Sequence, residues 1–259
     1  MPCPFLGIVY CNGAGASSEA VADMALFHII SVFRNMTWSH LAARSGNPQK
    51  WLHAHHCAPM LSHNPRGHTL GVVGLGNIGL AIAKKVRTAL GMKILYHDIA
   101  RKSQKLEEEV QARFYPSLQD MLPVTDCLLV AAPFSGETLI TAPVLDALKP
   151  GARFVNIGRG NLVDEDALAD ALESGHLGAV GLDVHAHEPH VSQRLVKSWK
   201  VTVTSHTGGG ALETNVGFER LAMENVERVL RGNEPLTPVN AHFLDKADRR
   251  TRSKPTPKL

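Results

Sequence analysis

A nearly continuous apolar run covers residues 20–33 and predicts a helix. Asp23, His28 and Ser31 interrupt this run, and it is too short to cross a bilayer. Apolar residues nevertheless cover most of the circumference of such a helix, so no side of it can be left in water. We therefore expect the helix to be buried against a second domain or a second subunit.

Further along the chain, short apolar runs alternate with segments that have helical periodicity. Runs typical of strands cover residues 68–73, 93–98, 113–115, 126–131, 152–157, 179–184 and 200–204. Segments typical of helices cover residues 80–90, 104–112, 117–122, 137–148, 165–173 and 212–231. Continuous apolar strands that alternate with helices indicate a parallel sheet buried on both faces. The pattern predicts an α/β fold with a doubly wound, Rossmann-type sheet and helices on both faces.

A glycine-rich turn lies between the first strand-like run and the helix that follows it. Gly74, Gly76 and Gly79 read G-x-G-x-x-G. In a dinucleotide site the first glycine allows a tight turn, the second lets backbone N–H groups approach the pyrophosphate, and the third lets helix and strand pack closely. The helix N-terminus then offers unpaired N–H donors and a partial positive charge to the anion.

The strand-like run at 93–98 ends in Asp98, where an adenine-ribose 2′-hydroxyl needs an acceptor. A ribose phosphate would be repelled by this carboxylate, so the pattern favours NAD over NADP. Arg101 and Lys102 follow closely and weaken that preference without reversing it.

Composition changes this picture little. The chain has 259 residues, 44% of them hydrophobic, and a formal net charge of +3, which is too small to indicate a nucleic-acid partner. Nothing in the sequence resembles a cleavable signal peptide or a membrane span. The four cysteines have no paired or metal-binding spacing and are typical of a reduced, intracellular protein. They are Cys3, Cys11, Cys57 and Cys127.

Polar residues follow three of the predicted strands at the edge where ligands of parallel sheets bind. Arg159 follows the strand at 152–157, Glu188 the strand at 179–184, and His206 the strand at 200–204. Oxidation of a 2-hydroxy acid requires a cation for the carboxylate, a base for the hydroxyl proton, and a carboxylate that orients the base. Taken singly, Arg159 could be a surface arginine and Glu188 a solvated loop carboxylate.

The remaining histidines raise the question of a metal. They form two groups, His53, His55, His56 and His63, and then His185, His187 and His190. Their spacings match no structural zinc site and no HExxH-type site, so we expect no metal centre.

At this point the sequence resembles the D-isomer-specific 2-hydroxyacid dehydrogenases over residues 7–238, with most likeness to the fungal mandelate, glyoxylate and hydroxypyruvate reductase branch. Four ordered motifs carry the resemblance: Gly74-Leu-Gly-Asn-Ile-Gly79 with Asp98, Val155-Asn-Ile-Gly-Arg-Gly-Asn-Leu-Val-Asp164, Gly178-Ala-Val-Gly-Leu-Asp-Val184 with Glu188-Pro189, and Ser205-His-Thr-Gly-Gly209. His185 departs from the bulky apolar residue that the family usually places after Asp-Val.

The resemblance implies catalytic roles for three residues. Arg159 would bind the substrate carboxylate, His206 would be the general acid/base, and Glu188 would hold the histidine ring. Asp183 would contact the nicotinamide carboxamide. The cofactor groove would otherwise be lined by Gly74, Gly76, Asn77, Ile78, Gly79, Asp98, Pro133, Thr138 and Ile157.

The resemblance also implies a domain organisation. Family members place roughly a hundred residues of substrate domain, about the size of a small domain, before the segment equivalent to 7–12. We therefore expect residues 1–64 to be a remnant of that domain with a long interface helix, and 65–210 to be the NAD-binding domain. Residues 211–240 would be a C-terminal return helix and segment, and 241–259 a disordered basic tail.

Two functions of different class remain open. The first is an NAD-dependent oxidoreductase acting on a D-2-hydroxy acid or 2-keto acid such as glyoxylate, hydroxypyruvate or mandelate. The second is a catalytically impaired dinucleotide-binding or dimerising fragment, or an NADH-sensing protein like the corepressor relatives. A homodimer is expected in either case. The cytoplasm is the expected compartment, although the terminal Pro257-Lys258-Leu259 resembles a Ser-Lys-Leu type peroxisomal address.

Overall fold

The computed structural model describes residues 8–13 and 15–240. The described chain forms two compact units. The larger unit is Ser18–Gly208, and the smaller combines residues 8–13 and 15–17 with residues 209–240. The predicted boundary at residue 64 lies inside the larger unit, so the helices before it belong with the sheet. The predicted tail lies outside the described residues.

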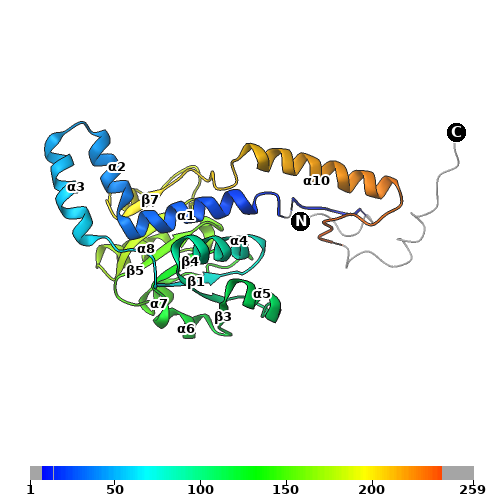
Figure 1. The fold of residues 1–259 in the computed structure, drawn as a ribbon, viewed down its shortest axis with the longest axis horizontal. Coiled ribbons are helices and arrows are strands. Elements are labelled where there is room, and N and C mark those ends of the chain that lie inside the picture. The colour runs from blue at the N-terminus through cyan, green and yellow to red at the C-terminus, as the bar shows by residue number, and fades with distance from the viewer. Residues whose placement is uncertain (1–7, 14, 241–259) are drawn as a thin grey trace. The chain divides into compact units, whose positions relative to one another are not determined.

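The larger unit is built on a seven-stranded sheet in which every neighbouring pair is parallel (Figure 1). The strands are β1 (Thr69–Val73), β2 (Lys93–His97), β3 (Ala112–Phe114), β4 (Cys127–Val130), β5 (Ala152–Asn156), β6 (Leu177–Leu182) and β7 (Val201–Val203). Their order is β3-β2-β1-β4-β5-β6-β7. The first three strands are therefore added toward one edge of the sheet and the last four toward the other edge. The point where the order changes, between β1 and β4, is where a doubly wound sheet forms its ligand crevice. The predicted Rossmann-type fold is confirmed.

Helices cover both faces of this sheet because successive strand side chains point to opposite sides and both sides are apolar. In β4, Leu129 packs into the cluster formed with α1 (Ser18–Arg34), α4 (Asn77–Lys85) and α5 (Gln104–Val110). Its neighbour Leu128 packs into the opposite cluster, with α6 (Leu118–Met121), α7 (Ala142–Asp146), α8 (Glu165–Glu173) and α9 (Gln193–Val196).

The apolar helix α1 is buried mainly by its own chain. Ala22, Ala25, Ile29 and Phe33 are fully buried against the sheet. The sheet and its neighbouring helices therefore bury one side of α1, and the expected burial of the other side against a second domain or subunit stays a prediction. Phe27 remains 47% exposed. Within the described ranges, no helix is long and apolar enough to cross a membrane, and α1 is no exception.

Two segments differ from the sequence prediction. The helix predicted over 137–148 is only α7, because the N–H groups of Leu139 and Ile140 donate to the carbonyl of Leu162 instead. Pro143, which fits a first helical turn, lies at the start of α7. The helices α2 (Met36–Arg44) and α3 (Pro48–Leu61) were not predicted, although Asn47 accepts hydrogen bonds that cap α3.

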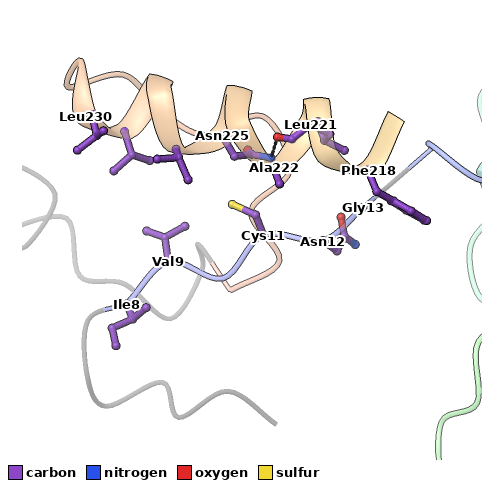
Figure 2. Close-up of a pocket in the computed structure, with 12 residues that line it drawn as sticks. Ile8, Val9, Cys11, Asn12, Gly13, Phe218, Leu221, Ala222, Asn225 and Leu230 are labelled. Carbon is purple, nitrogen blue, oxygen red and sulfur yellow. Dashed lines mark hydrogen bonds between the residues drawn. The ribbon is translucent and has the colours of Figure 1, made fainter. Parts of the chain in front are cut away.

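The smaller unit consists of α10 (Leu212–Leu230) and two extended segments joined by a bridge between Cys11 and Pro238. The buried amide of Asn225 ties α10 to the returning chain, because its oxygen accepts from the N–H groups of Leu236 and Thr237. A hollow of about 630 Å³ in this unit is lined mostly by apolar side chains (Figure 2). It offers no constellation of charged residues for catalysis.

Candidate active site

The glycine-rich turn joins β1 to α4, and each glycine meets a different steric requirement. Gly74 has a φ of +92°, which other residues rarely adopt. A Cβ on Gly79 would lie 2.2 Å from the carbonyl oxygen of Gly74, so the third glycine packs directly against the first. A Cβ on Gly76 would meet nothing within 4 Å. The second glycine thus leaves open space at the start of α4, where the fold predicts the pyrophosphate.

Asp98 lies immediately after β2, as the sequence predicted, and is bound to the glycine-rich turn. Its Oδ2 accepts a hydrogen bond from the N–H of Leu75 over 2.9 Å and lies 3.0 Å from Nζ of Lys102. Partial burial acts against the charged carboxylate, but the ammonium of Lys102 and the N–H of Leu75 outweigh it and hold the pKa of Asp98 below its usual value. The turn and its acceptor therefore lie where a dinucleotide site requires them.

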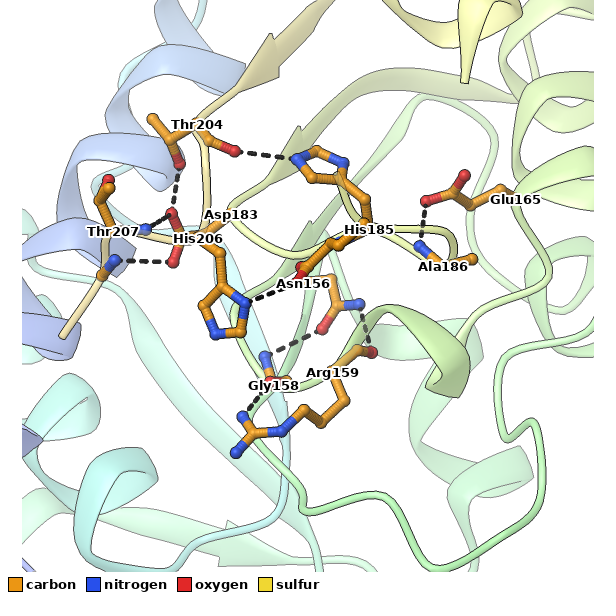
Figure 3. A network of polar contacts seen from close by, with 12 residues as sticks. Asn156, Gly158, Arg159, Glu165, Asp183, His185, Ala186, Thr204, His206 and Thr207 are labelled. Carbon is orange, nitrogen blue, oxygen red and sulfur yellow. Dashed lines mark hydrogen bonds and ion pairs between the residues drawn. The ribbon is translucent and has the colours of Figure 1, made fainter. Parts of the chain in front are cut away.

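The ends of β5, β6 and β7 bring the three predicted catalytic residues to one hollow of about 380 Å³. Figure 3 shows two of them, Arg159 and His206, with polar contacts around them. Arg159, Glu188 and His206 all line this hollow. Each follows a different strand of the same parallel sheet, so their carboxyl ends bring together residues far apart in the sequence. The structure also places Phe134, Asn161, His185 and His187 on the wall, which the sequence analysis had not assigned to the site.

Glu188 and His206 form a direct pair. Nδ1 of His206 lies 2.9 Å from Oε2 of Glu188, and the other oxygen accepts a hydrogen bond from the N–H of His185 over 3.0 Å. The hydrogen bond from His206 is the main reason that the pKa of Glu188 lies below its usual value, although burial opposes it. Because Nδ1 is used by Glu188, Nε2 is the ring atom that can exchange a proton with a substrate.

His206 also has an unusual backbone, with a φ of +55° in the left-handed region. Asp183 stabilises this turn. Its carbonyl accepts the N–H of His206 over 2.8 Å, and its carboxylate accepts the N–H groups of Thr207 and Gly208 over 3.1 and 2.8 Å. The predicted contact of Asp183 with a nicotinamide carboxamide remains a prediction, but a second task of this buried carboxylate is to hold the turn that carries His206.

Arg159 is exposed, and its position is set by the buried side chain of Asn156. The amide nitrogen of Asn156 donates to the carbonyl of Arg159, and its oxygen accepts from the N–H of Gly158. Nη1 of Arg159 donates to the carbonyl of Gly158 over 2.7 Å. The rest of the guanidinium fork offers donors of the kind that bind a carboxylate.

The other predicted cofactor residues fall into three positions. Asn77 and Ile78 form the first turn of α4 beside the glycine-rich turn. Pro133 and Thr138 are exposed in the loop after β4, and β4 is the strand that lies next to β1 in the sheet. Ile157 is buried in the apolar cluster at the end of β5, so packing already accounts for most of its surface.

Thr204 is the polar residue whose importance the sequence analysis missed. Its hydroxyl donates to Asp183 and accepts from Nε2 of His28 over 3.0 Å, while its carbonyl accepts from Nε2 of His185 over 2.8 Å. The same strand-end argument that identified His206 applies to Thr204, which follows β7 directly. His28 carried no such signal because it lies in an apolar helix.

No metal site accompanies this arrangement in the part of the chain that the structure describes. Within it, no three histidine, cysteine, aspartate or glutamate residues are placed so as to hold an ion.

Comparison with known sequences gives a consistent result. The profile described as "D-isomer specific 2-hydroxyacid dehydrogenase, NAD binding domain" matches residues 26–208. Over 240 residues the chain is 35% identical to a glyoxylate reductase of Pyrococcus horikoshii, covering 92% of this chain and 71% of that protein. A glyoxylate/hydroxypyruvate reductase A of Arabidopsis thaliana is 34% identical over 239 residues, with 92% and 72% covered.

Solved structures agree with the sequence comparison. The holo form of D-mandelate dehydrogenase from Rhodotorula graminis superposes with a TM-score of 0.88 at 42% identity, covering 90% of this chain and 68% of that chain. An NADPH-dependent glyoxylate/hydroxypyruvate reductase of Sinorhizobium meliloti has a TM-score of 0.79 at 32% identity, covering 91% and 72%.

Proposed function

The chain belongs to the D-isomer-specific 2-hydroxyacid dehydrogenase family, and on that premise we propose that it is an NAD-dependent oxidoreductase that interconverts a D-2-hydroxy acid and the 2-keto acid. The observation that carries the proposal is that Arg159, Glu188 and His206 line one hollow at the edge of the sheet that also presents the glycine-rich turn.

The residues of the turn fit a dinucleotide. Gly76 leaves room for a pyrophosphate, α4 presents its N-terminus there, and Asp98 offers an acceptor for a ribose hydroxyl. When bound, the nicotinamide supplies or accepts the hydride. We assign NAD as the preferred cofactor, with NADP as a weaker alternative because Lys102 partly neutralises Asp98.

The chain's own residues do the remaining chemistry. Arg159 binds the substrate carboxylate and polarises the 2-oxygen. In reduction, Nε2 of protonated His206 donates its proton to that oxygen, and in oxidation neutral His206 removes the hydroxyl proton at the same atom. Glu188 orients the ring through Nδ1 and stabilises its charged form.

The substrate is a small 2-keto acid of the kinds named in the relatives, namely glyoxylate, hydroxypyruvate or the keto acid of mandelate. The test is to follow NADH absorbance with the purified chain and each of these acids in turn. Turnover with at least one of them, lost in His206→Ala, is the expected result. Absence of turnover with all three, at a protein concentration that binds NADH, would overturn the enzymatic proposal.

A second function has its own supporting observation. The side chains of His206 and Glu188 are 45% and 37% exposed. Electrostatic catalysis is weaker where water reaches the reacting groups. A dinucleotide-binding protein with impaired catalysis, or an NADH sensor, would bind NADH but give no turnover in the absorbance assay.

We also propose a homodimer and a cytoplasmic location. The half-buried Leu26 and Ile30 and the exposed Phe27 on α1 are the apolar surface that a second copy would cover. The peroxisomal alternative depends on residues 257–259, which lie outside the described residues. A fluorescent reporter fused to residues 246–259 distinguishes the two, since a diffuse signal unchanged by removal of Leu259 supports the cytoplasm.

A further inference from the structure

We propose that His185 is a positioning residue that holds the Glu188–His206 pair and the Arg159 loop in one catalytic geometry. The inference rests on the proposed function, because it assigns a role toward the same three side chains. His185 lies directly after the strand-end Asp183-Val184 and is only 6% exposed.

The imidazole ring of His185 fixes the segment that leads to His206. Its Nε2 lies 2.8 Å from the carbonyl oxygen of Thr204, two residues before His206 (Figure 3). A carbonyl oxygen can only accept, so this nitrogen carries the hydrogen. The ring therefore joins the loop after β6 to the end of β7 by a defined hydrogen bond.

The main chain of His185 fixes the other member of the pair. Its N–H donates to Oε1 of Glu188 over 3.0 Å, while Oε2 of the same carboxylate is paired with Nδ1 of His206 over 2.9 Å. These contacts form a closed ring of interactions. The His185 ring binds the carbonyl of Thr204, two residues before His206, while His206 pairs with Glu188 and Glu188 accepts from the N–H of His185. A carboxylate held at both oxygens has little freedom to rotate away from His206.

The backbone of His185 also supports the loop that carries Arg159. A Cβ on Gly160 would lie 2.0 Å from both the carbonyl carbon and the carbonyl oxygen of His185. Glycine at position 160 is therefore what permits the two loops to touch. The three segments that carry Arg159, His206 and Glu188 therefore all meet at His185.

An apolar residue at position 185 would fill the same space without donating to Thr204. Substitutions at position 185 therefore separate a positioning role, which needs the hydrogen bond to Thr204, from a packing role, which needs only the volume. His185→Phe keeps the volume of a ring and the backbone N–H but removes the donor. His185→Gln places an amide N–H the same number of bonds from Cα as Nε2 of histidine, so it is the matched variant that can restore the hydrogen bond.

The first experiment compares kcat, KM for NADH and the pH profile in the wild type and both variants. His185→Phe is expected to lower kcat by between about 10- and 100-fold, because a misplacement of about 1 Å can cost on the order of 10²-fold. Its KM for NADH should stay unchanged and its pH midpoint should move, while His185→Gln should recover most of the loss. His185→Phe with the wild-type kcat and pH profile would overturn the proposal.

A second measurement needs no turnover and so separates this inference from the proposed function. NMR titration of the His206 ring is expected to differ between the wild type and His185→Phe, and to return toward the wild type in His185→Gln. The ¹⁵N spectrum of the wild-type chain should show the hydrogen of His185 on Nε2, which decides the matter if His185→Phe does not fold. A neutral His185 ring with its hydrogen on Nδ1 would refute the role of His185. An unchanged titration of His206 in folded His185→Phe would also refute it. An inactive wild type with the expected spectra would refute only the enzymatic function.

Discussion

The Nζ atom of Lys102 lies 3.0 Å from Oδ2 of Asp98, while the neighbouring Arg101 is turned away to Glu107. Nε and Nη2 of Arg101 donate to the two oxygens of Glu107 over 2.9 and 2.8 Å. This hydrogen bonding, with that from Tyr96, lowers the pKa of Glu107 to about 2. The two adjacent cations therefore differ in their access to a cofactor, and only Lys102 lies beside the expected ribose acceptor.

We predict tighter binding of NADH than of NADPH. The gap between the two affinities should depend on Asp98 and Lys102. Asp98→Ala should narrow the gap by about tenfold, or about 1.4 kcal/mol, because it removes both the hydroxyl acceptor and the repulsion of a ribose phosphate. Lys102→Gln should widen it, since the uncompensated carboxylate then faces that phosphate. Fluorescence titration of each variant measures the gap.

Arg101→Gln is the matched control for Lys102→Gln. Because Arg101 is held by Glu107, its loss should leave the ratio of the two affinities unchanged. Equal or tighter NADPH binding by the wild type would contradict the preference itself.

His206→Ala should abolish most of the turnover with a 2-keto acid. General acid/base catalysis typically contributes on the order of 10²–10⁴-fold, and that is the expected loss in kcat. Glu188→Gln should instead shift chiefly the pH profile, because the ring keeps a hydrogen-bonding partner but loses the negative charge beside it. Steady-state kinetics across pH separates the two effects, and a His206→Ala variant with unchanged turnover would remove His206 from the mechanism.

The pattern of apolar and polar residues was sufficient to predict the sheet, both covering layers and the positions of Arg159, Glu188 and His206 at strand ends. Those predictions succeeded because strand burial and ligand position in parallel sheets follow from local sequence and topology. The strand-end argument also places Thr204 at this edge of the sheet, but its partners could not be predicted, because its hydrogen bonds to His28 and His185 join residues 176 and 19 positions away. The failure over 137–148 has a similar cause, since the long-range acceptor Leu162 replaces helical hydrogen bonds there.

His28 should make the larger unit less stable in acid. Burial lowers the pKa of His28 to about 4, although Asp183 opposes the shift and His185 adds to it. The unfolded chain then binds this proton more readily than the folded chain, so the stabilisation is present in full above pH 6.5 and is lost as the pH falls toward 4. A difference of this size corresponds to about 3 kcal/mol.

Denaturant unfolding at several pH values measures this effect. His28→Gln, which keeps a donor for Thr204, should flatten the dependence between pH 6.5 and pH 4. His40→Gln, at an exposed position on α2, is the control and should leave it unchanged. The same acid slope in His28→Gln and the wild type would show that another group is responsible.

Light scattering at micromolar concentration should give the mass of a dimer. Ile30→Glu should weaken the association, because a charge buried without a partner is costly. Ile99→Glu, at a fully exposed site, controls for the added charge and should leave the dimer intact. A clean wild-type monomer would contradict the prediction, and circular dichroism checks that the half-buried position 30 tolerates the change.

Two of the glycines in the turn, Gly76 and Gly79, should fail in different ways when each receives a single methyl group. Gly79→Ala places a Cβ 2.2 Å from the carbonyl oxygen of Gly74, so backbone must move, and overpacking of this kind typically costs about 1–3 kcal/mol of stability. Gly76→Ala meets nothing within 4 Å and should fold with the stability of the wild type. The same empty space is where the pyrophosphate is expected, so Gly76→Ala should weaken NADH binding by about tenfold or more, or about 1.4 kcal/mol. Thermal unfolding and NADH titration of both variants test the assignment: Gly76→Ala with undiminished affinity would place the pyrophosphate elsewhere, because no contact within the described chain occupies that space.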